Sequence, residues 1–100
     1  MSEPQSEASR IVGERIRATR LRLGLSQEDI ADLAEMHVTN VGKIERGQTN
    51  PTLSTLVGLA GALNVDAAEW VGGLTTAMLP GRTHQVTAAD LIRERRRLER

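Results

Sequence analysis

The sequence predicts an all-α fold, and two observations support this prediction. Segments along the chain repeat apolar residues three or four positions apart, which is the period of a helix with one buried face. Aromatic residues, which favour strands, are nearly absent, because the 100 residues include one Trp and no Phe or Tyr. We therefore expect an aliphatic core that includes Trp70, in one compact domain with short tails.

Three helices are predicted in the N-terminal half. The first covers residues 7–23 and ends before Gly24, because glycine readily takes the left-handed conformation that terminates helices. Ser26 begins the second helix, since a serine hydroxyl can accept hydrogen bonds from the amides of the first turn. A turn over residues 35–37 leads to the third helix, over residues 38–46. So short a turn sets a defined angle between the second and third helices.

Two further helices are predicted after Pro51. The residue before a proline is disfavoured in the helical conformation, so this position separates the third helix from the fourth. Thr52 caps the fourth helix, and Asn64 can end it in the left-handed conformation. Residues 66–69 form a capping-box-like start for a short fifth helix.

These features divide the chain into four parts. Residues 1–6 are expected to form a disordered leader, and residues 7–73 the folded domain. Residues 74–86 contain Gly and Pro and are expected to be a linker. Thr87, with an acidic residue three positions later, predicts a C-terminal helix over residues 87–100.

The formal net charge is zero, from 13 basic and 13 acidic residues, but the charges are unevenly distributed. Arginines gather in residues 10–22 and 82–100, whereas acidic residues gather in residues 28–35. Attraction to a polyanion such as DNA must therefore come from local charge rather than from a globally basic surface.

The composition excludes several classes of protein. Without cysteine, the chain has no disulfide and no thiolate metal site. Its two histidines, His37 and His84, show no metal-ligand spacing, and no glycine-rich phosphate loop is present. No apolar run approaches the roughly 20 residues of a membrane span, and the polar, acidic N-terminus does not resemble a signal peptide. We expect a cytoplasmic protein that is not an enzyme, with no metal, cofactor or membrane partner.

Three blocks of sequence carry the strongest functional signal. Residues 26–34 read SQEDIADLA, residues 41–47 read VGKIERG and residues 50–53 read NPTL. Together, within residues 12–71, they resemble the phage-repressor or XRE-type helix-turn-helix family. The resemblance implies a five-helix, lambda-repressor-like DNA-binding domain, here with an extra C-terminal helix. The spacing suits this function, because the major groove admits one helix and a second helix braces it across the DNA backbone.

The resemblance also implies specific DNA contacts. Gln27, at the start of the second helix, matches a glutamine that touches the phosphate backbone. The third helix would be the recognition helix, with these residues facing outward: His37, Val38, Thr39 and Lys43, with Asn40 nearer the phosphates. The residues after it would hold the sugar-phosphate strand: Arg46, Gln48, Thr49 and Asn50. For His37, base contact and a role as a turn residue or helix cap both stay open.

Four other positions are notable against the family pattern. Arg20 and Glu45 match a structural ion pair that ties the first helix to the third. Glu35 stands in the turn where the family often has glycine, so a left-handed backbone there would be strained. Gly42 lies inside the recognition helix, where it costs ~1 kcal/mol of helix propensity relative to alanine. Its missing side chain would either allow a close approach to DNA or have no role.

We expect a sequence-specific transcriptional regulator, a repressor that binds double-stranded DNA at a two-fold operator as a homodimer. The alternative is a protein-interaction module with the same fold, either an antitoxin or a coactivator-bridging protein. The C-terminal helix carries an apolar stripe among arginines, formed by Leu91, Ile92 and Leu98. Three roles for this helix are open. It is a dimerising arm, whose surface another protein partner could also use. Otherwise it is a basic arm that contacts phosphates, or a solvated tail.

Overall fold

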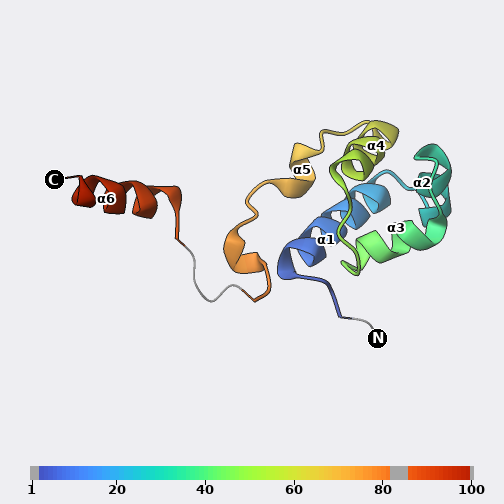
Figure 1. The fold of residues 1–100 in the computed structure, drawn as a ribbon. Helices are drawn as coiled ribbons and strands as arrows, with labels where there is room; N and C mark the ends of the chain where they lie inside the picture. The colour runs from blue at the N-terminus through green and yellow to red at the C-terminus, as the bar shows by residue number, and fades with distance from the viewer. Residues whose placement is uncertain (1–2, 82–85, 100) are drawn as a thin grey trace.

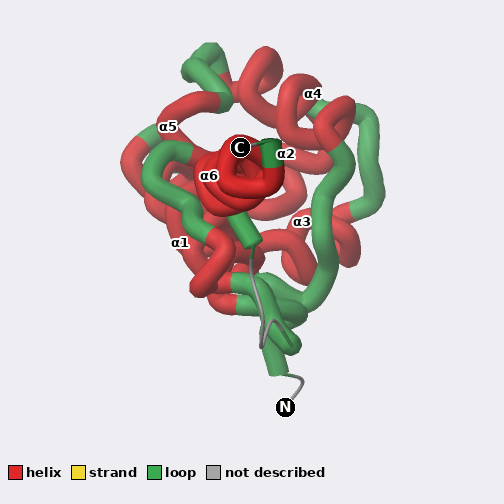
Figure 2. Tube along the Cα trace, turned by 60° about the vertical axis from the view of Figure 1, so that its left-hand side comes forward, coloured by secondary structure: helices red, strands yellow, loops and turns green. Residues whose placement is uncertain are grey.

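The computed structural model describes residues 3–81 and 86–99, and every regular element in these ranges is helical, which confirms the all-α prediction (Figures 1 and 2). The elements are, in chain order, α1 (Glu7–Arg22), α2 (Gln27–Leu33), α3 (Val38–Glu45), α4 (Leu53–Leu63), α5 (Ala68–Val71), a 3-10 turn η1 (Thr76–Met78) and α6 (Ala88–Leu98). The first five helices form the body of the molecule, in which α1 packs against α3 and α5, and α2 against α3 and α4.

The core of the body is aliphatic and closes around Trp70. The buried apolar side chains come from all five helices: Val12, Ile16, Ile30, Ala31, Val41, Ile44, Leu59, Ala60, Leu63 and Trp70. The indole Nε1–H of Trp70 donates to Thr19 Oγ1 at 3.0 Å, so the one polar atom of this side chain is satisfied in the core. Arg15 donates to the carbonyl oxygens of Trp70 and Gly72, which ties α5 to α1.

Side-chain caps define most of the helix starts. Ser6, Ser26, Thr52 and Thr87 each accept a hydrogen bond from an amide in the first turn of the helix that follows. Asp29 completes a capping box with Ser26, whose backbone amide lowers the pKa of the Asp29 carboxyl. The start of α5 differs from the predicted capping box, because the Asp66 side chain accepts from the Ala68 amide. The N-cap residue of α5 is Ala67, and it makes no side-chain capping hydrogen bond.

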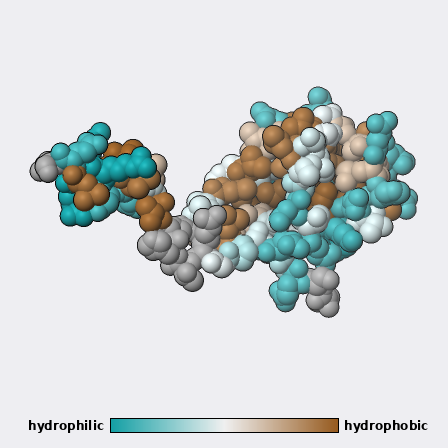
Figure 3. All heavy atoms as spheres, in the orientation of Figure 1, coloured by the Kyte–Doolittle hydropathy of each residue, from teal (hydrophilic) through white to brown (hydrophobic). Residues whose placement is uncertain are grey.

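α6 is separate from the body of the molecule (Figure 1). It begins with a capping box between Thr87 and Asp90. Its apolar stripe is solvent-exposed among hydrophilic residues (Figure 3), with Leu98 70% exposed. His84 lies outside the described residues. Within the described ranges, no helix combines the length and apolarity that a bilayer crossing requires.

Glu35 has φ 55°, in the left-handed region that strains residues other than glycine and asparagine. We expect Glu35→Asn to raise the free energy of unfolding by about 0.5–1 kcal/mol, because asparagine tolerates this conformation. Thermal unfolding followed by circular dichroism measures the effect. Asn64, also at φ 55°, is the matched control, since Asn64→Gly relieves little strain there. An unchanged or lower Tm for Glu35→Asn would show that the turn is not strained.

Candidate nucleic-acid interface

α2 and α3 are held at a fixed angle by a short turn and a shared apolar junction. The Met36 amide donates to the Ala31 carbonyl at 2.9 Å, and Glu35 reverses the chain through its left-handed conformation. Ile30 is completely buried, and Ala31 is small enough to lie where the helices meet. Since Val41 and Ile44 also point inward, the inward face of α3 is used for packing.

The opposite face of α3 is open to solvent. The exposed residues at its N-terminus and along this face are His37, Val38, Thr39, Asn40 and Lys43. Four of them were predicted to face outward, and Asn40 was predicted to lie beside them. His37 is the N-cap residue of α3, but its side chain makes no capping hydrogen bond. The fold therefore exposes one cationic side chain, Lys43, one apolar side chain, Val38, and three polar side chains on the solvent side of α3.

Arg20, Glu45 and Gln27 form a hydrogen-bonded cluster that links three helices. Arg20 binds Glu45 in a bidentate manner, with Nε to Oε2 at 2.7 Å and Nη2 to Oε1 at 3.0 Å, and Nη1 donates to the Leu25 carbonyl. The Glu45 carboxylate raises the pKa of the Arg20 guanidinium. Gln27 Nε2 donates to Glu45 Oε1 at 3.0 Å, so the predicted phosphate-binding side chain is oriented by the ion pair.

The loop between α3 and α4 is held against the N-terminal segment. The Gln5 amide donates to the Gly47 carbonyl at 2.7 Å, and Gln5 Nε2 donates to the Gln48 carbonyl. The Ser9 hydroxyl donates to Asn50 Oδ1. Three of the positions predicted to contact the DNA sugar-phosphate strand therefore lie in a tethered loop: Gln48, Thr49 and Asn50. Nothing in the sequence indicated Gln5 or Ser9, because their partners are more than 40 positions away.

Arg46 ends α3 and lies at the join between the outward face and this loop. Its Nε donates to Gln48 Oε1 at 3.1 Å, and the Gln48 amide donates to the Lys43 carbonyl at 2.9 Å. Arg46 is exposed, so its terminal nitrogens can donate to an anion at the surface.

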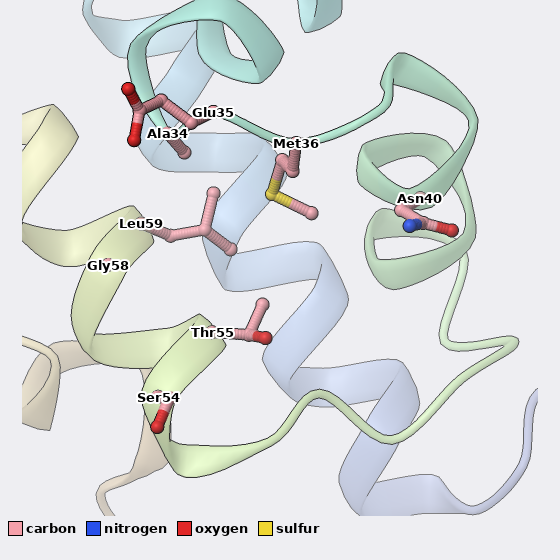
Figure 4. A pocket seen from close by; sticks show the side chains of 8 residues that line it. All are labelled: Ala34, Glu35, Met36, Asn40, Ser54, Thr55, Gly58 and Leu59. Atoms are coloured by element: carbon pink, nitrogen blue, oxygen red, sulfur yellow. The ribbon is translucent and has the colours of Figure 1, made fainter.

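A shallow cavity of about 320 Å³ lies between the α2–α3 turn and α4. Met36 and Leu59 lie toward each other across it, whereas Asn40 points away (Figure 4). Glu35 is the one ionisable group in this lining, beside the polar residues Asn40, Ser54 and Thr55. Residues 3–81 and 86–99 also contain no cluster of three or more His, Asp or Glu side chains suited to a metal ion.

A helix-turn-helix family model matches residues 16–70. The chain is 46% identical over 54 residues to the control protein C.SmaI of Serratia marcescens, covering 54% of this chain and 64% of that protein. It is 41% identical over 61 residues to an immunity repressor protein of Bacillus phage phi105, covering 61% of this chain and 42% of that protein.

Among solved structures, the restriction-modification controller protein C.AhdI from Aeromonas hydrophila superimposes with a TM-score of 0.61 and 39% identity. The match covers 62% of this chain and 94% of C.AhdI. The family model spans α2 and α3 together with their supporting helices. The chain therefore belongs to the XRE-type helix-turn-helix family.

Proposed function

We propose that this protein is a sequence-specific transcriptional regulator that places α3 in the major groove of double-stranded DNA. The carrying observation is the division of α3 into two faces, because Val41 and Ile44 are buried while the opposite side chains are free to meet bases. In helix-turn-helix proteins the second helix of the motif lies in the major groove while the first crosses the DNA backbone, and the packing of α2 against α3 suits these roles. The names of the relatives, a control protein and an immunity repressor, support repression.

The side chains suit distinct parts of a DNA site. Val38, 40% exposed, and the methyl group of Thr39 can pack on a thymine methyl group. Lys43 can donate to guanine acceptors or to a phosphate. We assign contacts with the DNA phosphates to Gln27 and to the tethered loop after α3, which includes Gln48, Thr49 and Asn50.

We further propose that two copies bind a two-fold operator, with half-sites ~34 Å apart, one turn of the duplex. A helix as short as α6 is marginal by itself in water, so its exposed stripe of Leu91, Ile92 and Leu98 supports pairing with a second copy. The stripe could equally accept another protein partner. A cytoplasmic location forms part of the proposal, since the relatives are bacterial and phage proteins whose DNA lies there.

The test is the combined change Thr39→Ala and Lys43→Ala. Each base contact is worth ~1–3 kcal/mol, and ~1.4 kcal/mol is tenfold, so we expect the Kd to rise at least tenfold for a duplex selected from random DNA. Mobility-shift titration at two salt concentrations measures it. If Lys43 binds a phosphate, the salt slope falls by about one, whereas it stays unchanged if Lys43 reads guanine.

Arg17→Ala is the control, because it removes one charge from the exposed side of α1. The proposal fails if the wild-type protein selects no duplex or if its binding is independent of salt. If the double variant bound DNA with unchanged affinity, the DNA-binding surface would lie outside α3. Unchanged regulation in cells by that variant would favour the protein-interaction module.

A further inference from the structure

Gly42 lies in the same row of α3 as Val38 and Arg46, at four-residue spacing. A Cβ atom built at Gly42 would lie 2.8 Å from Arg46 Nη1 and 3.5 Å from Arg46 Cζ. The Arg46 guanidinium therefore occupies the space where residue 42 lacks a side chain. Helical side chains lean toward the N-terminus, so this is the direction in which residue 46 naturally folds.

A second contact fixes the same side chain. Arg46 Nε donates to Gln48 Oε1 at 3.1 Å, and Gln48 is itself anchored through its amide to Lys43 and through its carbonyl to Gln5. The guanidinium is thus held between the surface of α3 and a tethered loop. Its Nη atoms remain available, because none of the hydrogen bonds or ion pairs among the described residues uses them.

We infer that Gly42 is a positioning residue, which holds the Arg46 guanidinium against the recognition helix in readiness for a DNA phosphate. The inference rests on the proposed function, and it gives a role to a glycine that weakens the helix. A planar guanidinium that is already ordered loses less entropy when it binds a phosphate than a freely moving one. With alanine at position 42 the guanidinium must move away, because the end of a flexible side chain yields more easily than the backbone.

The experiment compares four proteins: wild type, Gly42→Ala, Arg46→Ala and the double variant. We expect Gly42→Ala to raise the Tm by about 4 °C, through helix propensity, while weakening binding to the selected duplex about fivefold. We expect Arg46→Ala to weaken binding further and to lower the salt slope by about one. In the Arg46→Ala background, Gly42→Ala should have no effect on binding, because the side chain that it displaces is gone.

Two binding results would overturn the inference. Equal affinity of Gly42→Ala and wild type would show that the glycine has no positioning role. An equal loss in both backgrounds would show that the alanine methyl group meets DNA directly.

A measurement without DNA separates this inference from the proposed function. In the wild-type protein the Arg46 Nε–H, identified by its loss in Arg46→Ala, should give a distinct NMR signal because it is bonded to Gln48. In Gly42→Ala the signal should move to the position of free arginines. An unmoved signal would overturn the positioning role, whether or not the wild-type protein binds a duplex. A wild-type protein that binds no duplex would refute only the DNA-binding proposal.

Discussion

Replacing Gly13 by alanine is expected to lower the free energy of unfolding by about 3 kcal/mol, near the upper end for overpacking. A Cβ atom at Gly13 would lie 2.3 Å from the Ile44 carbonyl oxygen and 2.6 Å from that of Glu45. These obstacles are backbone atoms at the end of α3, so they cannot rotate away. The helix-propensity gain of alanine, ~1 kcal/mol, offsets only part of this cost. α1 and α3 must separate, and α3 would lose its support.

Urea unfolding monitored by Trp70 fluorescence measures this change, since the indole is 1% exposed in the folded protein. A lower midpoint with an unchanged m value would indicate lost stability. Gly58→Ala is the matched control, because Gly58 is also helical but has open space where the Cβ atom would be. The control should gain up to about 1 kcal/mol. A gain of similar size for Gly13→Ala would contradict the close approach of the two helices.

The second large effect is expected on breaking the ion pair between α1 and α3. Arg20→Ala should destabilise the protein by about 3–5 kcal/mol, because it strands a buried carboxylate. The Glu45 side chain is 1% exposed, and with Arg20 removed it keeps Gln27 as its side-chain partner among the described residues. Glutamine supplies a hydrogen bond but no compensating charge. The same urea titration measures the loss of stability.

An exposed ion pair provides the control for Arg20→Ala. Arg10 and Glu14 also pair, but the Glu14 side chain is 62% exposed, so Glu14→Ala should cost about 0–1 kcal/mol. Replacing Arg20 and Glu45 together by Met and Leu should cost less than Arg20→Ala, since no charge is then left unpaired. If Arg20→Ala and Glu14→Ala proved equally mild, Glu45 would have to be solvated in the folded state.

Sequence patterns located most of the helices because helix ends depend on neighbouring residues. The hydroxyls of Ser26 and Thr52 cap α2 and α4 as predicted, and Asn64 ends α4 in the left-handed conformation. The start of α5 differs from the prediction, since the Asp66 side chain accepts from the Ala68 amide rather than forming a capping box with Glu69. The periodicity of Val41 and Ile44 likewise separated the inward face of α3 from the outward one.

The sequence by itself thus determined the all-α class, the family and the outward residues of α3, because these follow from local periodicity, capping and motif spacing. Only the tertiary structure decided what the glycines do. Gly13 is required because α1 meets the backbone of α3 there, and the missing side chain of Gly42 leaves the space that the Arg46 guanidinium occupies. The tether from Gln5 and Ser9 to the loop after α3 is of the same kind. Such contacts join positions that are distant along the chain. The local sequence around either residue does not identify its partner, because only packing brings the two together.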